Sequence, residues 1–231
     1  EEERNPFLGL RSIRLSLQNL PLFRIQLRAI LRASALGPVQ VMFPLVATLK
    51  QLRQARAILD EVMHELRQEG IDHDPDLPVG VMIEVPSAVM VIDRLLDEVD
   101  FISIGTNDLI QYALAADRSN KDVAQLYQAS DPGVLRLIER SIQAAEDAGI
   151  PASVCGQMSG MPCYIPLLLG MGLRGFSVPP SSIPEVKQVC RSVTIAQCKE
   201  IADQAMCMDD AQQINQFLTR ELQAIAPELV A

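Results

Sequence analysis

Two short apolar segments, each followed by a carboxylate, constrain the fold of this chain most. Residues 79–85 and 101–104 are almost wholly apolar, which is typical of strands that are buried on both faces of a parallel sheet. The first segment carries Glu84 near its end, the second runs into residues 105–108 (GTND), and a third apolar segment ends in Cys155. Because the carboxyl ends of parallel strands share one edge of a sheet or one mouth of a barrel, we expect these side chains to face a common site.

Helical patterns lie between five predicted strands. The strands are expected at about residues 39–43, 79–85, 101–105, 152–155 and 175–178. Apolar residues recur at helical spacing over residues 49–68, which precede Gly70, and residues 132–148 begin with a proline and end before Gly149. Strands that alternate with helices predict a parallel sheet of the α/β class.

The two ends of the chain are expected to differ from this pattern. Residues 4–14 are predicted to form a polar loop, followed by an amphipathic helix at about residues 22–35 with no strand before it. After the fifth strand the chain is helical: Thr194 starts one helix with a capping box, and Asp209 or Asp210 starts the last. No repeat or linker divides the chain, so we expect one domain over residues 1–231.

Five strands are too few for a closed barrel of eight. The 231 residues, of which 48% are hydrophobic, are nevertheless enough for a sizeable core. The expected fold is therefore an open α/β sheet or the C-terminal part of a longer barrel.

Composition argues against several kinds of protein. The net charge of −9 is unfavourable for nucleic acid, and no apolar run approaches the roughly 20 residues of a membrane span. The charged residues 1–4 do not resemble a signal peptide. Five cysteines at spacings that match no zinc or redox motif predict free thiols in a reducing cytoplasm. His64 and His73 are expected at a solvated surface.

Three motifs carry a family resemblance. Residues 80–86 (GVMIEVP), 105–112 (GTNDLIQY) and 154–156 (VCG) strongly resemble the phosphoenolpyruvate-utilising enzymes. Residues 5–11 (NPFLGLR) and 167–173 (LLLGMGL), together with the Leu-Tyr pair that ends at Tyr127, resemble the enzyme I branch, which serves the bacterial sugar phosphotransferase system.

The resemblance implies a fold and an activity. Residues 1–231 would be the C-terminal part, about five of eight strands, of a TIM-type (β/α)8 barrel that binds phosphoenolpyruvate. The first three strands, the domain with the phosphorylated histidine and the domain that docks the histidine-containing phosphocarrier protein would lie upstream. The implied enzyme is a cytoplasmic, homodimeric phosphoenolpyruvate–protein phosphotransferase that releases pyruvate, and this fragment alone is expected to be inactive.

The resemblance also implies a role for individual residues. Glu84 and Asp108 correspond to Mg²⁺ ligands, and carboxylate oxygens suit that hard cation. Arg11 and Arg118 correspond to arginines that bind the substrate phosphate, and a further substrate arginine would lie on a strand upstream.

Two more polar residues have counterparts in the family. Asn107 corresponds to a substrate-binding amide, and Asp108 would also approach the substrate. Cys155 corresponds to the general acid that protonates the enolate, a role that suits a thiol with an ordinary pKa near 8.5. From the residues alone, Asp108 can instead cap a helix that begins at Leu109, and Cys155 can be a core thiol.

Two departures and two alternatives remain. The family usually has Cys-Gly-Glu where this chain has Gln157, and it has no counterpart of Pro179 and Pro180 after the last strand. One alternative function is a dikinase or phosphoenolpyruvate synthase of the same superfamily. The other, from a different class, is a non-catalytic module for dimerisation or for sensing phosphoenolpyruvate.

Overall fold

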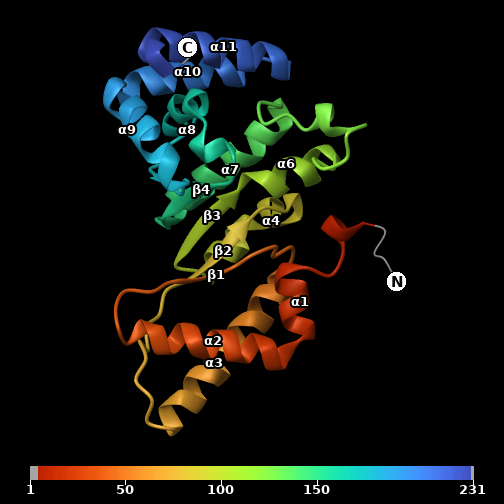
Figure 1. Cartoon of the computed structure of the whole chain (residues 1–231), viewed down its shortest axis with the longest axis vertical. Coiled ribbons are helices and arrows are strands. Elements are labelled where there is room, and N and C mark those ends of the chain that lie inside the picture. The colour runs from red at the N-terminus through yellow and green to blue at the C-terminus, as the bar shows by residue number, and fades with distance from the viewer. Residues whose placement is uncertain (1–4, 230–231) are drawn as a thin grey trace.

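A computed structural model describes residues 5–229 of the chain (Figure 1). The charged residues 1–4, on which the signal-peptide prediction rests, lie outside the described residues. Five strands form one parallel sheet in chain order, β1-β2-β3-β4-β5, as predicted. The strands are β1 (Val41–Phe43), β2 (Val79–Ile83), β3 (Phe101–Gly105), β4 (Ala152–Cys155) and β5 (Gly175–Phe176).

Helices alternate with these strands and continue after the last one. The α-helices are α1 (Ser12–Gln18), α2 (Leu20–Ser34), α3 (Leu49–Gln68), α4 (Pro86–Met90), α5 (Ile92–Leu96), α6 (Thr106–Leu114), α7 (Pro132–Ala148), α8 (Ile165–Gly170), α9 (Ile183–Ser192), α10 (Ile195–Met206) and α11 (Ala211–Ile225). Short 3₁₀ turns occur at η1 (Pro6–Leu8), η2 (Ala124–Leu126), η3 (Met158–Gly160), η4 (Pro162–Tyr164), η5 (Pro180–Ser182) and η6 (Pro227–Leu229). Figure 1 shows α1, α2 and α3 beside β1 at one end of the sheet, and α9, α10 and α11 at the other end.

Local signals explain the long helices. Helix α3 begins where Thr48 and Gln51 form a capping box, and α10 begins with the same arrangement of Thr194 and Gln197. Helix α7 has the predicted bounds, and α11 begins after Asp210, whose side chain accepts a hydrogen bond from Gln213. The sequence predictions for these four helices are confirmed.

The prediction for the N-terminal part is wrong over residues 12–14. A polar loop was expected there, but Ser12 begins helix α1. Ile13, which is 1% exposed, anchors this helix in the core. The break between α1 and α2 falls at Asn19, whose side chain caps α2. A seven-residue helix with one buried residue has too short an apolar pattern to be recognised from sequence.

Three strands are shorter than predicted. Strand β1 lacks residues 39 and 40, β2 ends before Glu84, and β5 lacks residues 177 and 178. Ser177 still donates its N–H to the carbonyl of Val154, so the ladder continues one residue beyond β5. Pro179 and Pro180 follow, and a proline has no N–H with which to extend the ladder further.

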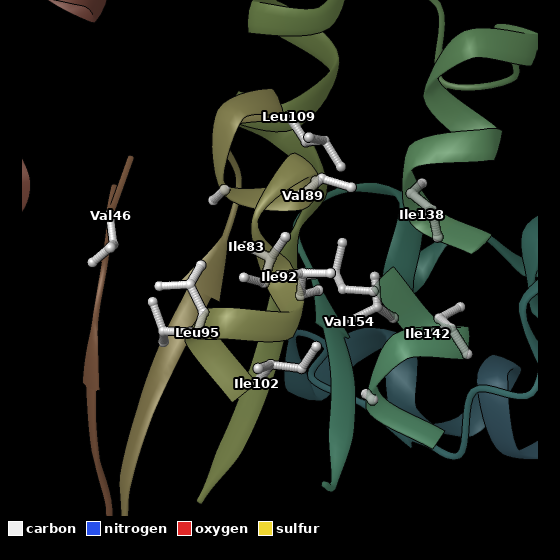
Figure 2. Packing of buried hydrophobic residues seen from close by; sticks show 14 of the residues in the cluster. Val46, Ile83, Val89, Ile92, Leu95, Ile102, Leu109, Ile138, Ile142 and Val154 are labelled. Carbon is white, nitrogen blue, oxygen red and sulfur yellow. The ribbon is translucent and has the colours of Figure 1, made fainter. Parts of the chain in front are cut away.

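The main core lies between the sheet and the helices that cover it. Figure 2 shows Ile83, Ile102 and Val154, from neighbouring strands, facing residues of α4, α5 and α7. The three strand side chains are 0% exposed. Burial of this side of the sheet is the main contribution to stability, at about 25 cal/mol for each Å² of apolar surface removed from water.

The other face of the sheet is only partly buried. Met82, Ser153 and Cys155 alternate with the buried strand residues and are half-buried, although Ser103 beside them is buried. The expectation of burial on both faces is therefore confirmed for β3 from Ile102 onward, whereas β2 leaves Met82 partly exposed. In a closed barrel this second face would line the interior, and five strands leave it accessible from the β1 and β5 edges.

Candidate functional site

The ends of three neighbouring strands lie side by side. The register pairs Ile83 of β2 with Ile104 of β3, and Gly105 of β3 with Cys155 of β4. Glu84, the residue after β2, is therefore level with Gly105 and Cys155 across the sheet. The prediction that these strand ends share one edge is confirmed.

Glu84 is a buried carboxylate, only 5% exposed. Its Oε1 accepts a hydrogen bond of 2.6 Å from the backbone N–H of Leu45. Burial raises the pKa of Glu84 to about 7; the bond from Leu45 opposes this rise, and the nearby charge of Asp108 adds to it. A side chain on Gly105 would have its Cβ 2.7 Å from Oε2 of Glu84, so only glycine leaves room for this carboxylate.

The turn after β1 is part of the site, although its sequence did not indicate it. Leu45 has a φ of 55°, in the left-handed region that residues with a Cβ rarely adopt. In this conformation its N–H is directed at Glu84. Backbone strain of this kind costs about 1–3 kcal/mol and is concentrated at functional sites.

Asp108 is the third residue of α6 and is 6% exposed. The alternative that it caps a helix starting at Leu109 is wrong, because α6 starts at Thr106. Both carboxylate oxygens of Asp108 accept bonds from the guanidinium of Arg11, at 3.0 and 3.3 Å. This paired geometry links the start of α1 to the first turn of α6.

Arg118 is in the loop after α6. Its backbone N–H donates to the side-chain oxygen of Gln111, at 3.3 Å. Its guanidinium lies 6.0 Å from the centre of the Phe7 ring, and that of Arg11 lies 5.5 Å from the same ring. Burial raises the pKa of the Tyr127 phenol, while the charge and a hydrogen bond of Arg118 lower it. The two predicted phosphate-binding arginines thus lie on one aromatic side chain.

Asn107 has a defined orientation. Its Oδ1 accepts a 2.9 Å bond from the backbone N–H of Gln157, and its carbonyl accepts one of 3.1 Å from the Tyr127 hydroxyl. Only the oxygen of an amide accepts from an N–H, so the NH₂ group of Asn107 is free to be a donor. Because this bond comes from the backbone of Gln157, a glutamine at this position can hold Asn107 as a glutamate would.

Cys155 lies at the inner face of the sheet and is half-buried. Burial raises the pKa of its thiol; a hydrogen bond with Ser103 lowers it, and the charge of Glu84 raises it further. The thiol is therefore protonated at neutral pH. A cavity of about 740 Å³ adjoins it. It is lined by Asn107 of α6 and by residues at or after the ends of β4 and β5, namely Cys155, Gln157, Met161, Val178 and Pro179.

Comparison with known proteins assigns the chain to a family. Residues 1–195 match the family described as PEP-utilising enzyme, PEP-binding domain. This chain belongs to the phosphoenolpyruvate-utilising enzymes. Its predicted family resemblance is thereby confirmed over most of its length.

Several relatives of this family are named phosphoenolpyruvate-protein phosphotransferase. The one from Priestia megaterium is 45% identical over 217 residues, which are 94% of this chain and 38% of that protein. The one from Enterococcus faecalis is 47% identical over 206 residues, 88% of this chain and 36% of that protein. The chain thus spans well under half the length of these relatives.

A solved structure supports the fold alone. A citrate lyase from Burkholderia xenovorans is 19% identical to this chain, with a TM-score of 0.52 over 87% of this chain and 68% of that one. It has a barrel-like α/β fold, so this phosphoenolpyruvate-utilising domain is a five-stranded portion of a TIM-type barrel.

The remaining sequence predictions have mixed outcomes. All five cysteines are free; Cys198 is buried, and Cys190 and Cys207 are exposed. His64 is exposed as expected, whereas Nε2 of His73 is buried without a hydrogen-bond partner, so the prediction of a solvated His73 is wrong at that atom. Over residues 5–229, no helix is long and apolar enough to cross a membrane.

Proposed function

We propose that this chain is the phosphoenolpyruvate-binding part of a phosphoenolpyruvate–protein phosphotransferase. In this reaction a phosphoryl group moves to a histidine on a separate domain, and pyruvate is released. The observation that carries the proposal is the joint position of two carboxylates, two arginines and a protonated thiol at one edge of the sheet. The names of the relatives that cover most of the chain support the same activity.

We propose that a divalent cation, Mg²⁺, binds between Glu84 and Asp108, since the charge of Asp108 already acts on Glu84. Glu84 is a buried carboxylate whose Oε1 has one backbone donor, and burial raises its pKa to about 7. A bound cation would offset the cost of ionising this buried group. Across residues 5–229 no three or more His, Cys, Asp and Glu side chains gather into a metal-sized group. A two-carboxylate site suits Mg²⁺, which completes its shell with water and substrate oxygens. When bound, the ion would supply positive charge that neutralises the phosphoryl group and the enolate.

Arg11, Arg118 and Asn107 would bind the substrate. The two guanidiniums donate in a planar fork that matches phosphate oxygens, and they keep their charge at all relevant pH values. The free NH₂ group of Asn107 would donate to a third oxygen, while Asp108 holds Arg11 in place. These groups orient the phosphoryl group for in-line transfer.

Cys155 would act after the phosphoryl group has left. The electron pair of the enolate forms a C–H bond with the thiol proton, which leaves pyruvate and a thiolate that water then protonates. Because burial raises the pKa of this thiol, it carries the proton to be donated at neutral pH. The cavity beside Cys155 is where the methylene carbon of the substrate would lie.

The proposal also includes a protein partner, which would be bound by other domains of a longer protein. The histidine-containing phosphocarrier protein would receive the phosphoryl group through domains upstream of this chain. A homodimer and a cytoplasmic location remain predictions that accompany this function.

A chimaera tests the proposal. This chain would replace the matching 217-residue region of the Priestia megaterium relative, and incorporation of phosphate from phosphoenolpyruvate into histidine would be measured. We expect transfer that needs Mg²⁺ but no nucleotide, and that Asp108→Asn abolishes. A folded chimaera that transfers only with a nucleotide would favour a dikinase or synthase. A folded chimaera that binds phosphoenolpyruvate without transfer would favour a sensing or dimerisation module.

A further inference from the structure

Phe7 joins two arginines that are far apart in the chain. The guanidinium of Arg11, at the start of α1, lies 5.5 Å from the centre of the Phe7 ring, and that of Arg118, after α6, lies 6.0 Å from it. Two guanidiniums that share a ring repel each other. The negative faces of an aromatic ring offset this repulsion, since a cation within about 6 Å of the ring centre is attracted by the ring quadrupole.

Tyr112 contacts both Phe7 and Arg11. Its hydroxyl accepts a bond of 3.2 Å from Nη1 of Arg11 and donates a short one to the carbonyl of Phe7. Helix α6 is therefore tied to the N-terminal turn η1 and to Arg11 by one hydroxyl group. Together with Asp108, this leaves Arg11 little freedom to move.

Phe7 does not serve the hydrophobic core. It is half-buried, it belongs to neither cluster of core residues, and a cavity of about 260 Å³ lies beside it. A phenylalanine that only filled space would be packed on its free side. Its position is instead explained by the two cations that it contacts.

We propose that Phe7 and Tyr112 are positioning residues that hold Arg11 and Arg118 together as one binding site for a phosphate dianion. This inference rests on the proposed function, because it assigns the residues that prepare the phosphate subsite of that reaction. Phe7 and Tyr112 need not touch the substrate; they act through the arginines. Without the ring and the hydroxyl, the two cations would separate, and binding would have to bring them together again.

Binding of inorganic phosphate and of phosphoenolpyruvate to the chain, followed by calorimetry or ³¹P NMR, tests the proposal. Phe7→Leu keeps an apolar side chain but removes the ring, and we expect about tenfold weaker phosphate binding. Phe7→Tyr restores the ring and should recover the affinity that Phe7→Leu loses. Tyr112→Phe removes only the hydroxyl and should weaken binding several-fold. Leu8→Ala, in the same turn at a side chain that is 63% exposed, is the matched control and should bind like the wild type.

A second measurement separates positioning from folding. In the proposed metal site the ligands are Glu84 and Asp108, not Phe7, so Phe7→Leu should bind Mn²⁺ at least as well as the wild type does. Equal phosphate affinity of Phe7→Leu and wild type would overturn the proposal. Loss of both ligands in Phe7→Leu, failure of Phe7→Tyr to recover binding, or a wild type that binds no phosphate would also overturn it. If phosphate binding requires Phe7 but the chimaera transfers nothing, the proposed function fails while the phosphate site stands.

Discussion

Glu84 shows how a single residue acquires properties that its sequence position does not reveal. Its pKa of about 7 lies above the ordinary value of 4.5, chiefly because the carboxyl group is buried. The folded state therefore holds this proton at pH values where the unfolded state has lost it. The stabilisation by the protonated group is complete below about pH 4.5 and is lost as the pH rises through 7.

With a chelator present to remove metal ions, deprotonation of Glu84 should lower the free energy of unfolding by roughly 3 kcal/mol between about pH 4.5 and pH 7. Urea denaturation at a series of pH values measures the fall. Glu84→Gln, which keeps the shape of the side chain without the titration, isolates the contribution as the difference between variant and wild type. An identical pH profile for both proteins would show that Glu84 does not titrate in this range.

Cys155 carries the second prediction at this scale. In the chimaera, Cys155→Ala should lower pyruvate formation by about 100-fold or more, since a general acid contributes in the transition state. The affinity for phosphoenolpyruvate should change little, because the thiol is not among the groups proposed to bind the phosphate. Kinetics and calorimetry of the same preparation give the two values. Undiminished turnover with alanine would assign Cys155 to packing.

At the scale of elements, the contact between α8 and α10 depends on one glycine. A Cβ on Gly170, the last residue of α8, would lie 2.1 Å from the backbone carbonyl oxygen of Cys198 in α10. Backbone atoms cannot move aside as a flexible side chain can. The two helices are held at a separation that only glycine allows.

Gly170→Ala should therefore lower the free energy of unfolding by about 2 kcal/mol or more, as overpacking of a core does. Gly37→Ala is the control, because no atom lies within 4 Å of the Cβ that it adds. Urea denaturation compares the two variants with the wild type. The argument would be wrong if both substitutions had the same small effect.

At the scale of the whole molecule, the sheet has two open edges. Strand β1 pairs only with β2, and β5 only with β4, across the described residues 5–229. The outer side of each edge presents backbone N–H and C=O groups that a closed barrel would pair. These edges lie at about residues 41–43 and 175–176, close to the positions predicted from the sequence.

The isolated chain should therefore self-associate or be less stable than a complete barrel. In sedimentation velocity over a concentration series, the average mass should rise above the monomer mass of 25.4 kDa as the protein concentration increases. The chimaera provides the comparison, since its added strands would cover an edge. A chain that stays monomeric at high concentration, and is as stable as the chimaera, would contradict this prediction.

Local sequence signals were enough to predict the alternating helices and strands and the residues at the strand ends. Capping residues and apolar spacing are local signals, so α3 and α7 have the bounds that were predicted for them. Glu84, Asp108 and Cys155 could be placed at one edge because parallel strands share a direction. Helix α1 was missed, since one buried residue, Ile13, leaves no periodic pattern.

The contacts between these residues could be found only in the folded chain. The N–H of Leu45 that holds Glu84, the paired contact of Arg11 with Asp108, and the ring of Phe7 beneath two guanidiniums join segments that are distant in the chain. No local pattern encodes such contacts, because they depend on the path of the whole sheet. The raised pKa of Glu84 is likewise a consequence of burial, which exists only once the core has formed around the carboxylate.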